Sequence, residues 1–243
     1  MIEFHQVSKT YRVSGQDIPA LLPTDLRIEA GQIFGLIGHS GAGKSTVVAL
    51  IARLYDPDEG AILLDGVPLP RLSLRELRGA IGLVPQEAFV FSETIADNIA
   101  MGLDTGERRE ERIREAARIA RLEEAIAGFP EGYQTRLGER GINLSGGQRQ
   151  RTTLARALAR DPRILVLDDA LSAVDTHTET EILTGLRHVR RGRTAIIVSH
   201  RVSAVMDADL ILVLDEGRVV ERGTHHELIR ANGLYSSLLR RQI

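Results

Sequence analysis

The stretch "IFGLIGHSGAGKSTVVALIARL", residues 33–54, joins an apolar run to a helical pattern through a glycine-rich turn. Within it, "GHSGAGKST" (38–46) satisfies the pattern G-x-x-x-x-G-K-[ST]. Glycines let the backbone curl so that successive N–H groups point inward, and the start of the helix adds partial positive charge. The stretch therefore predicts a strand, a phosphate-binding loop and a helix, in that order.

Each residue of this loop has an expected role. Lys44 is expected to reach the β- and γ-phosphates of a nucleotide, and the Ser45 hydroxyl to ligate Mg²⁺. The remaining expected contacts to the nucleotide come from Gly38, His39, Ser40, Gly41, Ala42, Gly43 and Thr46. The alternative is a glycine-rich turn that binds nothing, but the flanking strand and helix favour phosphate binding.

Further short apolar runs, rich in β-branched residues, read as buried strands. Helical spacing separates them, as in "QRQRTTLARALARD" (148–161). This alternation predicts an α/β fold with a mostly parallel sheet covered by helices, and places polar groups at the carboxyl ends of the strands. The predicted strands are "AIGLVPQ" (80–86), "ILVLDD" (164–169), "TAIIVSH" (194–200) and "LILVLD" (210–215).

Two segments depart from the alternation. Residues 96–129 are charged and Ala-rich, with apolar side chains at helical spacing, and predict an inserted helical subdomain with one apolar face; a single solvated helix is the alternative. The apolar residues are Ile113, Ala116, Ala117, Ile119, Ala120 and Ile126. Near the end, "DEG" (215–217) predicts a hairpin, and "HHELIRANGLYSSLLRRQ" (225–242) a helical region that Gly233 interrupts.

Composition limits the classes of function. The 243 residues are enough for one large α/β domain, and the net charge of −2 gives no electrostatic case for binding nucleic acid or an anionic membrane. The absence of Cys excludes disulfides, thiolate metal sites and cysteine nucleophiles. No run reaches the ~18 apolar residues of a membrane helix, and the first residues lack the apolar core of a signal peptide. We therefore expect no direct membrane insertion.

The stretch "ILVLDDALSAVD" (164–175) supplies the second half of a nucleotide site. Its apolar residues keep the strand buried, and Asp168 at the carboxyl end can hold Mg²⁺ through water. Asp169 follows directly and Asp175 comes after a short polar break. A strand-ending Asp alone is often only a loop cap, but beside a phosphate loop it indicates a metal ligand.

The segment "LSGGQRQR" (144–151) decides the family. Ser145, Gly146 and Gly147 precede a helical segment and make another anion site from N–H groups and a hydroxyl. One nucleotide does not need two such helix ends within one domain, so the second site suggests that it contacts a nucleotide held by another domain. With Gln148, this segment resembles the LSGGQ signature of the ATP-binding-cassette (ABC) family, and the resemblance covers essentially the whole chain.

The resemblance implies a single ABC ATPase domain over residues 1–243, with the fold of a P-loop NTPase. Residues 1–86 and 160–243 would form a RecA-like core with an antiparallel β portion near the N-terminus, and about 87–159 the helical subdomain with the signature. In that family two domains pair head to tail, and each signature closes over the ATP held by the other phosphate loop. The expected partners are a second such domain, as a homodimer or heterodimer, and transmembrane domains. The expected location is cytoplasmic, at the inner face of the membrane, with the isolated chain soluble.

The resemblance also assigns roles to single residues. Tyr11 stands where the family has an aromatic side chain stacked on adenine, and an ordinary packed Tyr is the alternative. Gln86 matches the loop glutamine that touches Mg²⁺ and senses the transmembrane partner. Asp175, in "SAVD", matches a carboxylate that acts across the dimer. His200, in "VSH", matches the switch histidine at the γ-phosphate. The alternatives are a polar strand cap for Gln86 and a structural histidine for His200.

Two branches of the family are recognisable. "TRLGERG" (135–141) resembles the exporter element that contacts coupling helices, and residues from about 50 onward read as an exporter half-transporter. The first 46 residues resemble the ATPase subunit of a bacterial methionine importer, whose carboxy-terminal regulatory domain is absent. We therefore predict a chimeric domain joined near the phosphate-loop helix; the alternative is one natural lineage.

Asp169 stands where the family normally has the Glu that polarises the attacking water. The two acids have similar ordinary pKa values, about 3.9 and 4.3, so reach is what differs. Losing one methylene withdraws the carboxylate by roughly 1 Å, and such a misplacement can cost on the order of 10²-fold in rate. We expect tight Mg-ATP binding with slow hydrolysis, catalysed by Asp169, His200, Lys44 and Gln86.

Other functions remain in competition. A nucleotide-binding module that dimerises with negligible turnover would show ATP-dependent dimerisation without phosphate release. A soluble cassette ATPase acting on nucleic acid or ribosomes is disfavoured by the net charge, the few aromatic residues and the exporter-like element.

Overall fold

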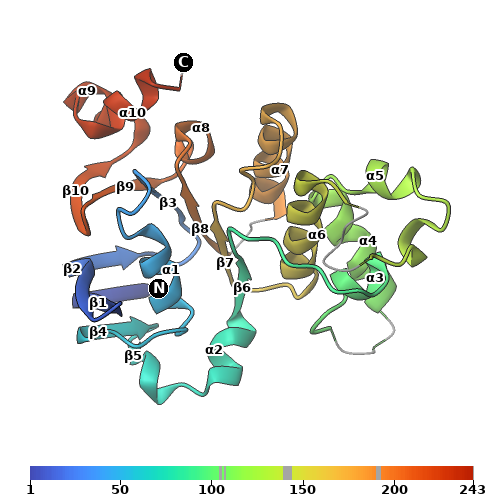
Figure 1. Cartoon of the computed structure of the whole chain (residues 1–243), viewed down its shortest axis with the longest axis horizontal. Helices are drawn as coiled ribbons and strands as arrows, with labels where there is room; N and C mark the ends of the chain where they lie inside the picture. The colour runs from blue at the N-terminus through green and yellow to red at the C-terminus, as the bar shows by residue number, and fades with distance from the viewer. Residues whose placement is uncertain (104–105, 107, 139–143, 190–192, 243) are drawn as a thin grey trace. The chain divides into compact units, whose positions relative to one another are not determined.

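The computed structural model describes residues 1–103, 106, 108–138, 144–189 and 193–242. The chain divides into two compact units. The first combines Met1–Ile81 with Gly192–Ile243, and the second is Gly82–Arg191. Figure 1 labels the helices and strands of both units.

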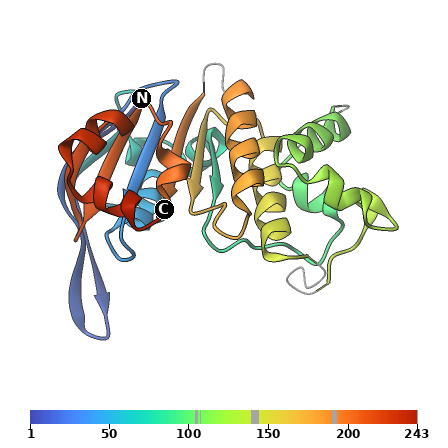
Figure 2. The same cartoon turned by 90° about the horizontal axis from the view of Figure 1, so that it is seen from above.

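An antiparallel sheet opens the first unit. Its strand order is β2-β1-β4-β5. Alternate side chains point to its core, as at Ile2 and Phe4, which period-two strands require. Figure 2 shows the hairpin of β1 and β2 extending beyond the other strands of its unit. The strands are β1 (Ile2–Val13), β2 (Gln16–Ile28), β4 (Glu59–Leu64) and β5 (Val67–Pro68). The antiparallel β portion expected near the N-terminus is confirmed.

The second sheet region of this unit carries the central strands, in the order β10-β9-β3-β8. β3 (Ile33–Gly38) pairs in parallel with both β8 (Thr194–Ser199) and β9 (Leu210–Asp215). All six residues of β3 are buried, as expected for a strand covered on both faces. β9 and β10 (Arg218–Gly223) form the predicted hairpin, whose turn residues Glu216 and Gly217 both have positive φ.

Helices accompany these strands. α8 packs on β3 and β8, and α10 packs on α8, α9 and β3. Asn232, in the left-handed conformation, ends α9, and Gly233 begins α10, so the predicted interruption is confirmed. The helices of the unit are α1 (Lys44–Ile51), η1 (Leu69–Arg71), α2 (Leu74–Ala80), α8 (Val202–Val205), α9 (His225–Ala231) and α10 (Leu234–Arg240).

The second unit is mainly helical. α3 and α4 pack on α6, and β7 lies beside β6 (Figure 1). Every apolar residue predicted to form the helical face, from Ile113 to Ile126, is buried. Its elements are β6 (Ile81–Val84), α3 (Ile95–Ile99), α4 (Arg109–Ile119), α5 (Glu123–Ala127), η2 (Gly132–Gln134), α6 (Gly146–Ala159), β7 (Ile164–Asp168) and α7 (Thr176–Val189). The predicted subdomain boundaries at about residues 87 and 159 remain a prediction.

Some elements end earlier than the sequence predicts. The strand predicted over 80–86 spans only Ile81–Val84, because a capping box at Ser73 starts α2, which continues through Ala80, and Pro85 has no N–H for a ladder. α1 ends at Ile51, and Arg53 takes a positive φ. Among the described residues, no helix combines the length and apolar character needed to cross a membrane.

His225 is a group through which pH should affect the stability of the first unit. Its Nδ1 lies 2.7 Å from the hydroxyl of the fully buried Tyr235. Burial lowers the pKa of His225, the adjacent His226 adds to this, and Asp207 opposes it. The native side chain binds a proton less readily than the unfolded one. The contribution of His225 to the free energy of unfolding is therefore fully present above about pH 6.5 and is lost as the pH falls below that value.

The expected result is a steeper loss of melting temperature in the parent than in His225→Gln between about pH 7.5 and pH 5.5. Thermal denaturation followed by circular dichroism measures it. His226→Gln is the matched control, because His226 is exposed, and it should retain most of the parent's pH dependence. Parallel curves for the parent and His225→Gln would contradict the assignment.

Candidate nucleotide-binding site

The phosphate loop connects β3 to α1 in the first unit. The ammonium group of Lys44 is held by the backbone of the loop, because Nζ donates to the carbonyl oxygens of Gly38 and His39, each at 2.8 Å. Lys44 is buried, whereas the rim residues Ser40 and Ser45 are exposed. A buried cation beneath an open, polar rim fits an anion such as a nucleotide phosphate.

The same loop is supported from behind by other strands. The Gly217 N–H, in the β9–β10 turn, donates to the Ala42 carbonyl at 3.1 Å, and Leu22 N–H donates to the Gly217 carbonyl at 2.9 Å. Gly43 has φ 101°, and a Cβ there would lie 2.3 Å from the Ala20 carbonyl oxygen of β2. The loop can therefore adopt this curl only with glycine at position 43.

His200 and the phosphate loop leave the same edge of the sheet. Ile37 pairs with Ser199 in the parallel register of β3 and β8, so Gly38 and His200 follow at corresponding positions. His200 is exposed, and its carbonyl accepts a hydrogen bond from Gln242 Nε2 at 2.6 Å. The register brings the predicted switch histidine to the edge where the phosphate loop begins.

Tyr11 lies on β1, opposite Ile18 of β2. Its ring meets the Tyr55 ring edge-on, with centroids 5.3 Å apart, and Lys9 Nζ lies 5.8 Å from the Tyr11 centroid. The Tyr11 side chain is partly exposed. This is an aromatic surface that a planar ligand could use, and its role toward adenine remains a prediction.

The acidic strand end belongs to the second unit. Asp168 closes β7 and is only 8% exposed. Asp169 has φ 48°, in the left-handed region, and its carbonyl accepts from the Ser172 N–H at 3.2 Å. Asp tolerates this region better than most residues. The chain therefore turns sharply at the second carboxylate, as part of the turn that leads to Asp175.

Ser145, at the predicted signature, is the N-cap of α6. Its hydroxyl accepts from the Gln148 N–H at 3.2 Å, and Gln148 Oε1 accepts from the Ser145 N–H at 2.8 Å. This capping box satisfies two N–H groups at the start of the helix. Ser145 is exposed, so the helix end faces solvent in the single chain.

The signature helix is locked to the loop that carries Asp175. A Cβ at Gly147 would approach the Ala173 carbonyl oxygen to 2.9 Å, so the two backbones lie in close contact. Gln150, only 5% exposed, donates to Ser172 Oγ at 3.0 Å and accepts from the Ala173 N–H at 2.9 Å. Gln150 is a supporting residue that the sequence did not predict. Its helical spacing from Leu154 and Ala157, on the buried face of α6, is the signal that could have identified it.

Asp175 begins the helix α7. Its Oδ1 accepts from the Thr178 N–H at 2.9 Å, and this bond lowers the pKa of the carboxyl. The side chain is exposed. Within one chain it therefore acts as a helix cap that stays ionised and reachable from outside.

Gln86 follows β6 and is exposed. Nearby in the unit, residues 135–137 of the exporter-like element run beside residues 93–95: Ile95 N–H donates to the Thr135 carbonyl and Leu137 N–H to the Glu93 carbonyl, both at 3.0 Å. Residues 139–141 of that element lie outside the described part of the chain.

The predicted site residues thus fall into two groups. Tyr11, the loop 38–46 and His200 lie in the first unit, whereas Gln86, Asp168, Asp169, the signature and Asp175 lie in the second. Within the described ranges, no cluster of three or more His, Cys, Asp or Glu side chains forms a ready metal site. The Mg²⁺ donors remain those predicted from the sequence, the Ser45 hydroxyl in the first unit and the Gln86 amide and Asp168 carboxylate in the second; each offers the oxygen ligand that Mg²⁺ prefers.

The chain is similar to known proteins along nearly its whole length. The family model described as "ABC transporter" matches residues 21–172. The "Mitochondrial potassium channel ATP-binding subunit" of Xenopus tropicalis is 48% identical over 99% of the chain and 35% of its own length. The "ATP-dependent lipid A-core flippase" of Escherichia coli K12 is 45% identical over 99% of the chain and 41% of its own length. The chain thus spans well under half of these relatives.

A solved structure gives the same result in three dimensions. It is described as "Structure of a bacterial Atm1-family ABC exporter with ATP bound". The TM-score is 0.92 at 43% identity, with 99% of this chain and 41% of that chain covered. The α/β P-loop fold that the sequence predicted is thereby confirmed.

The expected chimera is not supported. A single relative matches 99% of the chain at 48% identity, so no joining of two branches near residue 46 is needed to account for the sequence. From its motifs, its fold and its relatives along nearly its whole length, the chain belongs to the ABC transporter family.

Proposed function

We propose that the chain is the Mg-ATP-binding and ATP-hydrolysing domain of an ABC exporter, and that two such domains pair head to tail to drive transport. One observation carries this most directly. The chain has two anion-binding helix starts, the phosphate loop with the buried Lys44 and the capped signature helix at Ser145. A head-to-tail pair would use both, one from each chain, around each nucleotide.

Within that pair, the residues have distinct proposed roles. Lys44 neutralises the β- and γ-phosphates, His200 contacts the γ-phosphate, and Asp169 orients the attacking water. Bound Mg²⁺, held by Ser45, Gln86 and Asp168, would supply charge neutralisation on the phosphates. The remaining contacts are Tyr11 to adenine, Gly38–Thr46 to the phosphates, and Ser145, Gly146, Gly147, Gln148 and Asp175 across the pair.

Hydrolysis is proposed to be slow because of Asp169. The carboxylate sits on a left-handed residue at the end of β7, and it is shorter by one methylene than the Glu usual in the family. ATP binding should be preserved, because the phosphate contacts come from other residues. A dimerisation module with negligible turnover is the second candidate, and the same short carboxylate supports it.

The transporter context is proposed from the relatives. Those named above are an exporter, a flippase and an ATP-binding subunit of a channel. We propose that this chain works beside transmembrane domains at the cytoplasmic face of a membrane, in the export direction. The absence of a basic surface charge excess argues against nucleic acid as the partner.

A mixing experiment tests the proposed function. Lys44→Met damages the phosphate loop and Ser145→Arg blocks the signature, so each variant alone should be inactive. Mixed in equal amounts, half of the pairs contain one intact composite site, and phosphate release should recover to about a quarter of the parent rate.

Size-exclusion chromatography with and without Mg-ATP provides the companion measurement. The parent should shift to a dimer with Mg-ATP, and Lys44→Met should not. Recovery of phosphate release on mixing supports nucleotide sites that are each built from two chains. A Ser145→Arg variant that is active on its own would overturn the role of the signature. A dimer shift with no phosphate release, even over hours, would favour the dimerisation module.

A further inference from the structure

Arg156 lies on α6, far along the helix from the signature, and its guanidinium group is largely buried. It donates from Nε to the Asn98 carbonyl at 2.8 Å, from Nη2 to Asn98 Oδ1 at 2.8 Å, and from Nη1 to the Phe89 carbonyl at 2.9 Å. The guanidinium carbon also lies 5.3 Å from the centroid of the Phe91 ring. One side chain of α6 thus holds α3 and the segment 89–91 together.

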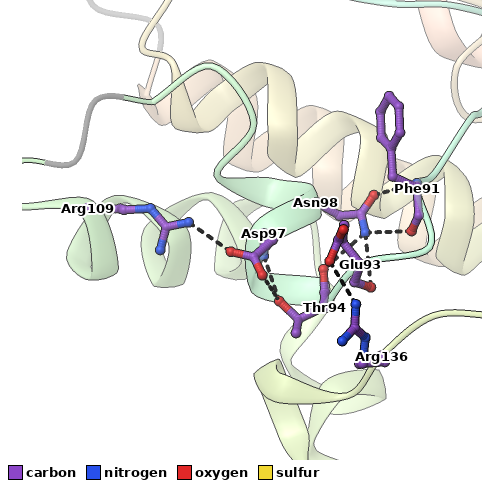
Figure 3. Close-up of polar contacts among 7 residues, drawn as sticks. All are labelled: Phe91, Glu93, Thr94, Asp97, Asn98, Arg109 and Arg136. Atoms are coloured by element: carbon purple, nitrogen blue, oxygen red, sulfur yellow. Dashed lines mark hydrogen bonds and ion pairs between the residues drawn. The ribbon is translucent and has the colours of Figure 1, made fainter.

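Asn98 completes the attachment. It is fully buried on α3, and its Oδ1 accepts from the Phe91 N–H at 2.8 Å. Its Nδ2 donates to the carbonyls of Phe91 and Thr94, both at 3.0 Å. Figure 3 shows this amide facing the backbone of the loop. Because segment 85–93 has no helix or strand of its own, side chains supply the partners that its backbone needs.

Burying the charge of Arg156 has an energetic cost. Burial lowers the pKa of its guanidinium group, which shows that the environment disfavours the charged form. A buried cation is tolerated when hydrogen bonds satisfy it, and the fork of arginine reaches several acceptors at once. A simple packing position on α6 would be filled at lower cost by an apolar side chain. Arg156 therefore indicates a need to fix the segment 89–91 in one place.

A second set of contacts lies where the same loop meets α3. Asp97 accepts from Thr94 Oγ1 at 2.7 Å and from Arg109 of α4 at 3.0 Å, and Glu93 pairs with Arg136 at 3.1 Å (Figure 3). Asp97 thereby attaches α3 to α4, and Glu93, at the end of the loop, is attached to residue 136. The segment that follows Gln86 is thus held at several points within the second unit.

We infer that Arg156 is a positioning residue, which transmits the position of the signature helix to the segment that carries Gln86. The inference rests on the proposed function, because it gives the contact a role in ATP hydrolysis. α6 is a continuous helix from Gly146 to Ala159. A movement of its signature end therefore moves Arg156, and through the Phe89 carbonyl it moves the backbone three residues from Gln86.

Two measurements on the 243-residue chain test the inference. Arg156→Met keeps the bulk of the side chain and removes its hydrogen bonds. Amide hydrogen exchange in residues 89–94 should rise by about 10-fold without nucleotide, because the Phe89 and Asn98 tethers are lost. Single-turnover phosphate release should fall by roughly 10-fold at unchanged affinity for a fluorescent ATP analogue, because Gln86 is misplaced rather than removed.

A double-mutant cycle separates positioning from general destabilisation. If Arg156 acts through Gln86, adding Arg156→Met to Gln86→Ala should lower the rate by less than about 2-fold further. Exposed Arg118→Met, on α4, is the control for removing an arginine from the same unit and should change neither exchange nor rate. If Arg156→Met does not fold, Arg156→Lys replaces it, since a lysine keeps the charge but cannot reproduce the fork.

The outcomes distinguish the two proposals. If the parent neither binds nor hydrolyses ATP, the proposed function fails. Unchanged exchange in 89–94, or effects of Arg156→Met and Gln86→Ala that simply multiply, would overturn the inference while leaving the proposed function intact. Faster amide exchange in residues 89–94, together with a double-mutant cycle in which the effects of the two substitutions do not multiply, supports the positioning role of Arg156.

Discussion

Asp169→Glu is expected to raise the rate of phosphate release by roughly 10- to 100-fold, because the longer side chain restores about 1 Å of reach toward the attacking water. The affinity for ATP should change little, since Lys44, Ser45 and Asp168 make the proposed phosphate and metal contacts. Steady-state and single-turnover phosphate release on the same preparation measure the effect. The gain should lie in kcat, with KM for ATP nearly constant.

The backbone at this position predicts a cost that accompanies the gain. Asp169 has φ 48°, and Asp tolerates the left-handed region better than Glu, so Asp169→Glu should lower the free energy of unfolding by about 1 kcal/mol or less. Asp169→Asn is the matched control: it keeps the length and the backbone preference, removes the charge, and should reduce the remaining hydrolysis. If Asp169→Glu and the parent turn over at equal rates, the short carboxylate does not limit the reaction.

The fold could be predicted from the sequence where local chemistry and global packing agree. The run 33–38 is apolar on both faces because β3 is covered on both faces, and the following glycines and Lys44 form the loop that phosphate binding requires. The buried apolar face of the helical subdomain followed from residue spacing alone. Element ends were less predictable, because caps such as Ser73 and the left-handed Arg53 decide them.

The supporting contacts of the candidate site could not be predicted in the same way. Gln150, Asn98 and Arg156 are polar side chains on helices. Gln150 and Arg156 reach partners 22 or more residues away in the sequence, and Asn98 reaches backbone groups of the loop four to seven residues before it. A residue pattern shows that such a side chain is buried but not which carbonyl it reaches. The predicted chimera is not supported, because one relative matches 99% of the chain at 48% identity; the likeness of residues 1–46 to another branch did not identify a separate origin.

Gly43→Ala is expected to have the largest effect on the phosphate loop. Position 43 has φ 101°, and the added Cβ would lie 2.3 Å from the Ala20 carbonyl oxygen, with the Gly217 Cα at an ordinary contact distance of 3.6 Å. Neither neighbour is a flexible side chain, so the loop must shift away from β2 and lose the curl that directs its N–H groups inward. We expect the free energy of unfolding to fall by about 3 kcal/mol and ATP affinity by 100-fold or more, from combined strain and overpacking.

Gly31→Ala separates these two causes. Gly31 also has a left-handed φ, of 78°, but a Cβ there meets nothing within 4 Å. It should therefore show only the conformational cost, about 1 kcal/mol, with ATP affinity unchanged. Urea unfolding gives the stabilities, and titration with a fluorescent ATP analogue gives the affinities. Equal losses of unfolding free energy in the two variants would mean that the backbone conformation alone, and not the contact with Ala20, requires glycine at position 43. Unchanged ATP affinity in Gly43→Ala would show that the loop tolerates displacement from β2 and that its observed curl is not what binds phosphate.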